Sequence, residues 1–197
     1  MRTPIVVAAL SAALCGCTDG SVISYNYYNS GYEPGQVALA AANSPSLAVI
    51  QNDPFPEDTN NEGVLAAMQG RNLGPRMYFS QTPRPDDKYG YKVVMNFGAA
   101  SSAGDSGYGS YGYSLVGGTS YQCQARPTPP AAKPTSGDIS VTGAFCVGDQ
   151  LLTDASGSIS GATGPDDPRF QRLIGDMMVA LTPPYIPHGG HKCNLNC

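Results

Sequence analysis

The chain has no tryptophan, only two histidines, and few charged residues, which make up 13% of its 197 residues. Both histidines, His188 and His191, lie in the last ten residues, outside the expected core. A Ser-His or Cys-His nucleophile would therefore have to borrow a histidine from the tail, which argues against such an enzyme. The formal net charge is −4 and no Lys/Arg cluster is present, so the sequence also argues against a nucleic-acid partner.

Long hydrophobic runs are also lacking, except for one near the N-terminus. Residues 5–14 are uncharged and rich in Ala, Val and Leu, and Arg2 precedes them. Spanning a bilayer takes about 20 apolar residues, so this run is too short for a transmembrane helix. A positive start, a short apolar run and a polar continuation predict a secretory signal peptide over residues 1–16.

The end of this run resembles the lipobox of bacterial lipoproteins, in which Leu, a small residue and Gly precede a cysteine. Leu14-Cys15-Gly16-Cys17 fits, with Cys17 as the lipidated residue and Cys15 at the variable position. The resemblance implies a diacylglyceryl thioether and an N-acyl chain on Cys17. Two or more acyl chains hold a protein on a membrane. We therefore expect a lipid-anchored protein of the cell envelope that faces the periplasm, at the outer membrane.

Glycine and proline, 24 and 17 residues, are concentrated in a few segments. Their composition predicts a low-complexity stalk at 17–35, a flexible Gly/Ser/Tyr insertion at 98–118 and a Pro-rich loop at 126–137. The last ten residues, 188–197, form a His/Cys tail. A single folded domain is expected over residues 36–187, interrupted by the insertion and the loop.

Hydrophobic periodicity predicts the fold class. Short apolar or alternating runs at 47–51, 77–80, 91–97, 120–125 and 138–146 predict strands, and residues from 150 onward predict a hairpin partner. A capping-box pattern before residue 62 predicts a helix that ends at Gly70. Asp167 and Pro168 precede a stripe with helical spacing that ends at Thr182. We expect an α+β domain: an antiparallel sheet of about five to six strands with two amphipathic helices on one face.

Three stretches, NDPFPEDTNNEGVLAAM, YKVVMNF and AFCVGDQLLTDASGSISGATGPDDPRFQRLIGDMMVAL, resemble a family of alphaproteobacterial proteins of uncharacterised activity. The resemblance spans about residues 47–184. Its most specific parts are the Ala-Phe-Cys hairpin and the Gly-Pro-Asp-Asp-Pro-Arg-Phe helix start. It implies a proteobacterial envelope setting and no particular activity, and the tail after Pro187 has no counterpart in it.

The cysteines of the expected domain, Cys123 and Cys146, both fall on expected strands. An exported protein meets an oxidising compartment, so these two residues are expected to form a disulfide. Two buried free thiols are the alternative.

The tail brings together both histidines and two further cysteines. His188, His191, Cys193 and Cys197 offer two imidazoles and two thiols, a donor set suited to Zn²⁺ or Cu⁺. Their spacing matches no known zinc finger. A Cys193–Cys197 disulfide and a tail with free thiols are the alternatives, and no other cofactor is expected.

Paired carboxylates are the remaining candidate chemistry. They occur at Glu57/Asp58, Asp86/Asp87 and Asp166/Asp167, and such pairs hydrolyse glycosidic bonds in many enzymes. Each pair also suits a loop, a turn or a helix start, which is the reading we favour. The sequence thus predicts a lipid-anchored envelope protein with a binding or structural role and a protein or glycan partner. A metal-binding lipoprotein is the alternative, and a carboxylate-based glycan hydrolase is a distant one.

Overall fold

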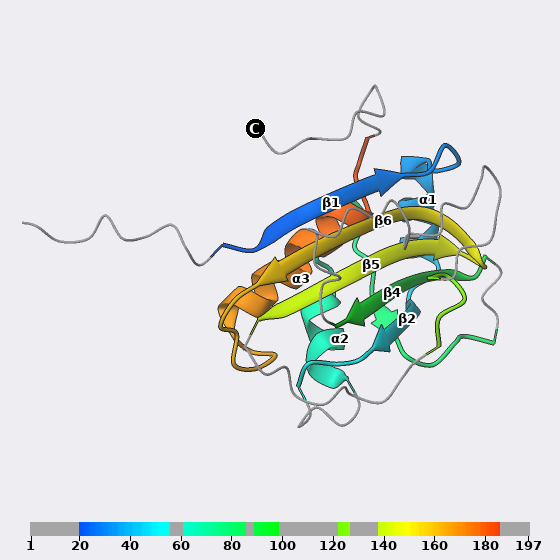
Figure 1. The fold of residues 1–197 in the computed structure, drawn as a ribbon. Helices are drawn as coiled ribbons and strands as arrows, with labels where there is room; N and C mark the ends of the chain where they lie inside the picture. The colour runs from blue at the N-terminus through cyan, green and yellow to red at the C-terminus, as the bar shows by residue number, and fades with distance from the viewer. Residues whose placement is uncertain (1–19, 56–60, 86–88, 99–121, 127–137, 186–197) are drawn as a thin grey trace, which may run out of the picture.

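The computed structural model describes residues 20–55, 61–85, 89–98, 122–126 and 138–185 (Figure 1). These residues contain six strands and three helices. In chain order the elements are β1 (Val22–Tyr28), α1 (Pro34–Ala42), β2 (Ser46–Gln51), α2 (Glu62–Met68), β3 (Phe79–Ser80), β4 (Tyr91–Phe97), β5 (Ile139–Val147), β6 (Gln150–Ile159) and α3 (Pro168–Leu181). The strands form one sheet in the order β1-β6-β5-β4-β2-β3.

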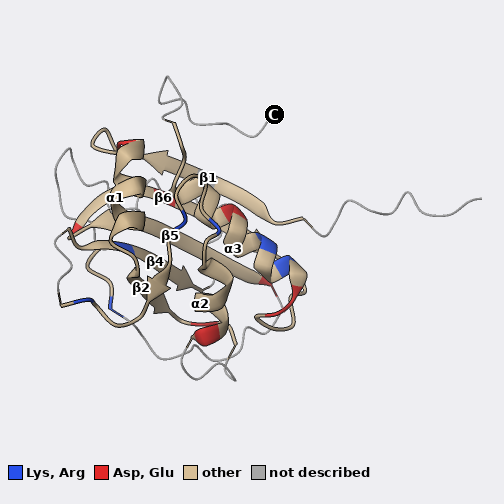
Figure 2. Cartoon of the chain, turned by 180° about the vertical axis from the view of Figure 1, so that it is seen from behind, with Lys and Arg blue, Asp and Glu red and all other residues tan. Residues whose placement is uncertain are grey.

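The domain has two layers, and all three helices cover the same face of the sheet (Figures 1 and 2). The apolar side chains of α3 that have helical spacing are all buried, as expected for a helix that packs on a sheet. Gly143 on β5 lies beneath this helix: a Cβ there would come within 2.9 Å of Leu181 and of Met177. A residue without a side chain therefore lets α3 pack close to the middle of the sheet.

The α+β class is confirmed, but the sheet is mixed and not purely antiparallel. β4, β5, β6 and β1 pair antiparallel, whereas β2 pairs parallel with both β4 and β3. Parallel neighbours need a long crossover connection, and the chain between β2 and β4 supplies one that includes α2. The alternating pattern of each strand does not reveal its direction, so the sequence could not distinguish these pairings.

The N-terminal strand was not expected. Residues 22–28, which composition assigns to a stalk, form β1 and pair along β6 from Val22 opposite Ser158 to Tyr28 opposite Thr153. Tyr32, also in the expected stalk, is fully buried, and its hydroxyl donates to the Pro183 carbonyl at 2.6 Å. Tyr and Ser suit both a polar spacer and the half-exposed edge of a sheet, so composition alone misassigned them.

Two further elements differ from the expectation. Helix α1 begins inside the expected stalk, where Glu33 and Gln36 form a reciprocal capping box and Pro34 occupies the first turn. Its ALAAA sequence lacks a clear apolar stripe, so periodicity did not identify it as a helix. The segment 120–125, expected as a strand, is described from residue 122 onward, and residues 122–124 form a turn.

The start of α3 matches the sequence prediction. The Asp167 carboxylate accepts hydrogen bonds from the backbone and side chain of Arg169, at 2.9 Å and 3.0 Å. The side-chain bond from Arg169 is the main reason why the pKa of Asp167 lies well below its usual range. The carboxyl therefore stays ionised, and it complements the positive end of the helix dipole.

We expect Asp167→Ala to lower the free energy of unfolding by about 1 kcal/mol at pH 7, because the helix loses its N-cap. Asp167→Asn is the matched control, since it keeps a capping oxygen and removes only the charge. Urea unfolding followed by circular dichroism measures both variants. An alanine variant as stable as the parent would show that this cap contributes nothing.

Candidate functional site

The face of the sheet opposite the helices is here called the outer face; it points toward the viewer in Figure 1. Strand register places a row of polar side chains straight across it. Gln51 lies opposite Asn96, Asn96 opposite Thr142, and Thr142 opposite Ser156. Four neighbouring strands thus present amide and hydroxyl groups side by side, because paired residues in a sheet share a face.

The next row on the outer face is mostly apolar. Val49 lies opposite Val94, Val94 opposite Ala144, and Ala144 opposite Asp154 on β6. The first three belong to a small buried cluster that is separate from the main core. The outer face therefore carries a polar row and an apolar row in direct contact.

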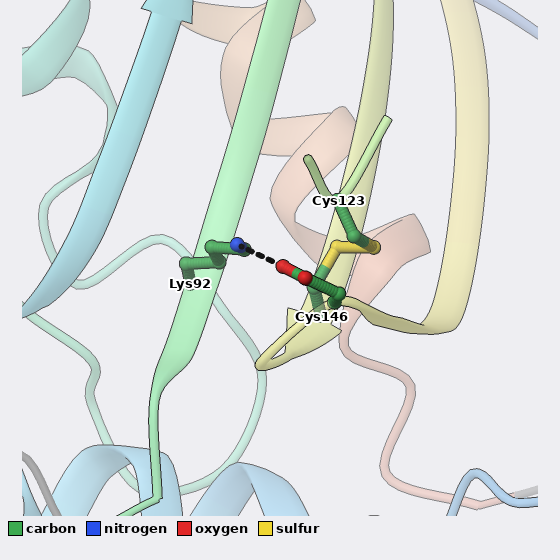
Figure 3. Close-up of a disulfide and its surroundings, with 4 residues drawn as sticks. Lys92, Cys123 and Cys146 are labelled. Atoms are coloured by element: carbon green, nitrogen blue, oxygen red, sulfur yellow. Dashed lines mark hydrogen bonds and ion pairs between the residues drawn. A yellow bond between two sulfur atoms is a disulfide. The ribbon is translucent and has the colours of Figure 1, made fainter. Parts of the chain in front are cut away.

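A disulfide holds another segment of the chain against this face. Cys123 and Cys146 are joined with an Sγ–Sγ distance of 2.02 Å, and both are fully buried (Figure 3). The Gln51 side chain donates to the carbonyl of Arg126 at 2.6 Å, which attaches the segment at a second point. Residues 122–126 thereby form a wall over the strands β2, β4 and β5.

This wall and parts of the two rows line a hollow of about 260 Å³ that is partly open to solvent. Its polar lining consists of Gln51, Asn96, Gln122 and Thr142. The rest of the lining is Val94, Ala125, Gly143 and Ala144. The eight lining residues that belong to the described ranges are uncharged, so this part of the hollow suits a small neutral molecule with both hydrogen-bonding and apolar surface.

Asp154 lies at the far end of the apolar row, next to Ala144 and opposite Tyr27 of β1. Its side chain is buried, and Oδ1 has no hydrogen-bond partner within the described parts of the chain. Burial raises its pKa from 3.8 to about 7. Asp154 is therefore a carboxyl that takes up a proton near neutral pH, at the edge of the outer face.

A charge pair on the outer face lies outside the hollow. Lys92 of β4 contacts Asp149 in the β5–β6 turn at 3.4 Å (Figure 3). The Asp149 side chain is 57% exposed, so solvent screens this pair and it adds little stability.

The residues predicted from sequence are distributed as follows. Cys17 and the tail residues His188, His191, Cys193 and Cys197 lie outside the described residues, so lipidation and metal binding stay predictions. The carboxylate pairs Glu57/Asp58 and Asp86/Asp87 also fall outside them. The third pair lies at the start of α3, where Asp167 has the capping role given above.

Within the described ranges, no group of three or more His, Cys, Asp or Glu side chains could hold a metal ion.

No helix in the part of the chain that the structure describes is both long and apolar enough to cross a membrane.

No family model, no curated protein and no solved structure matches the chain. The family resemblance noted from the sequence therefore stays a prediction.

Proposed function

We propose that the protein is a lipid-anchored envelope protein that binds a small, uncharged, polar ligand in the hollow on its outer face. The observation that carries the proposal is the amide and hydroxyl row of Gln51, Asn96 and Thr142 directly beside the apolar row of Val94 and Ala144. A saccharide unit fits this pattern best, because its hydroxyls hydrogen-bond at the edge and its C–H groups pack on apolar surface.

Amide side chains support this ligand class. Each amide carries a carbonyl acceptor and an NH₂ donor, and a hydroxyl both donates and accepts. A sugar hydroxyl needs both kinds of partner at once, whereas a charged ligand would need a counter-ion that the described lining residues do not provide. A glycan was also one of the two partner classes that the sequence predicted.

Hydrolysis of such a glycan receives less support. Two carboxyls about 5–10 Å apart would be needed on either side of the bond. The residues paired with Asp154 across the sheet are Ala144 and Tyr27, neither of which is acidic. We therefore favour binding without turnover.

Thr142→Val tests the hollow, because valine keeps the shape of threonine and removes the hydroxyl. We expect binding of a neutral sugar to weaken roughly 3- to 10-fold, the effect of losing one hydrogen bond. Thr163→Val, on the exposed loop before α3, is the matched control and should bind like the parent. Saturation-transfer NMR with neutral mono- and disaccharides, N-acetylglucosamine among them, identifies the ligand and measures its affinity. Absence of binding by any of these sugars to the parent protein would remove the saccharide proposal.

Lipid attachment is tested at the two neighbouring cysteines. We expect Cys17→Ser to move the protein from the membrane to the soluble fraction, because its acyl chains are lost. Cys15→Ser should remain in the membrane, since Cys15 leaves with the signal peptide. Intact-mass analysis of the parent should show an N-terminal acylated Cys17. A Cys17→Ser protein that stays fully membrane-bound would contradict the anchor.

A further inference from the structure

The folded domain begins very close to the proposed anchor. β1 starts at Val22, and Gly20 is the first residue that the structure describes. Cys17 is three residues before Gly20, and an extended chain spans at most about 3.6 Å per residue, so their Cα atoms are at most about 11 Å apart. A lipidated Cys17 therefore brings the surface around Gly20 to the membrane.

That surface includes helix α3. The Ser21 hydroxyl donates to the Asp176 carboxylate near the middle of the helix. β1 and α3 also contact each other, and the Asn26 side chain donates to the Ala180 carbonyl. Figures 1 and 2 show the start of β1 beside α3 from both sides of the molecule.

The exposed side of α3 carries both arginines of the helix. Arg169, Arg172 and Asp176 follow at spacings of three and four residues, so they share one side of the helix. Figure 2 marks the basic residues of α3 in blue and the acidic ones in red. Arg169 pairs with Asp167 at 2.7 Å, and Asp176 accepts the bond from Ser21. Arg172 is exposed, and no ion pair to it occurs among the described residues.

We infer that this side of α3, with Arg172 at its centre, rests on the phosphate groups of the phospholipid surface. The inference depends on the proposed lipid anchor. Two observations lead to a membrane as the occupant: the short chain between Cys17 and β1, and an exposed arginine that forms no ion pair with any residue the structure describes. The domain is then held in one orientation and does not hang from a stalk.

Thiol labelling of the membrane-bound protein tests the orientation. Arg172→Cys places a thiol on the proposed contact surface, and Tyr78→Cys places one at an exposed position next to β3, at the opposite edge of the sheet from β1. Both are made in a background where Cys193 and Cys197 are serine. The probe is a bulky, membrane-impermeant PEG-maleimide.

We expect labelling at position 172 to be lost in intact membranes and to return in detergent, whereas position 78 is labelled equally in both. A Gly/Ser linker of about 20 residues inserted before Gly20 spans roughly 25 Å and should restore labelling at position 172 in the membrane. Equal labelling of the two positions in a protein whose mass shows the lipid would overturn the orientation and leave the anchor intact. A protein without the lipid mass would instead refute the anchor, and the orientation with it.

Discussion

Asp154→Asn is expected to stabilise the domain at pH 8 and to have little effect near pH 4. The pKa of Asp154 is about 7 in the folded protein, against 3.8 for an exposed aspartate, because burial disfavours the charged carboxylate. Asparagine keeps the size of the side chain and carries no charge. The expected gain is up to about 4 kcal/mol, the free energy that corresponds to a shift of this size.

The direction of this pH dependence follows from proton binding. Between pH 4 and pH 7 the folded protein retains a proton on Asp154 that the unfolded chain has already released. Stability therefore falls as the pH rises through this range, and the loss levels off above the folded-state pKa. The lowered pKa of Asp167 acts in the opposite sense and only below about pH 4, so it does not obscure the effect.

Urea unfolding at a series of pH values from 4 to 8 measures this dependence. The asparagine variant should show a flatter profile than the parent. Asp149→Asn, which removes an exposed carboxylate in the β5–β6 turn, is the control and should leave the slope unchanged. Parallel profiles for the parent and Asp154→Asn would show that Asp154 is not a buried acid.

Loss of the Cys123–Cys146 bond is expected to destabilise the domain by about 3 kcal/mol, the loop-entropy contribution for two cysteines that are 23 residues apart. The double variant Cys123→Ala/Cys146→Ala should also lose affinity for the ligand of the hollow. The reason is that residues 122–126 are then attached to the sheet mainly through the Gln51–Arg126 hydrogen bond.

Unfolding midpoints with and without a reducing agent measure how much the disulfide contributes to the stability of the domain. Replacing Cys193 and Cys197 by serine is the control, because it leaves the bond between Cys123 and Cys146 in place. Thiol labelling of denatured, unreduced protein is the direct test of the bond. Two reactive thiols at positions 123 and 146 in periplasm-derived protein would contradict it.

The parts of the fold that could be predicted from the sequence have strong local signals. α3 combines a capping aspartate, a proline at the first position and an uninterrupted apolar stripe. β4 alternates clearly, and Gly148-Asp149 marks the turn between β5 and β6. In each case the local preference and the tertiary packing agree, so the short-range pattern was sufficient.

The parts that could not be predicted depend on distant partners. β1 is stabilised by pairing with β6, and α1 is stabilised by burial of Val37 and Ala40. The local sequence of each element does not indicate these partners. The candidate site also depends on residues that are distant in the sequence. Asn96 and Thr142 look like ordinary solvent-facing positions of two strands, and only the register places them in one row with Gln51.

The pairing of the first strand with the sixth also sets the order of events during biogenesis. Val22 meets Ser158, so the sheet cannot be completed until most of the chain has been delivered. In a chain exported from its N-terminus, Cys17 would emerge long before the strand next to it has a partner. Signal cleavage and acylation would therefore act on an unfolded, accessible segment, and closure of the fold would come afterwards. Pairing over so long a sequence separation also slows folding, which would extend the time available for the proposed modification.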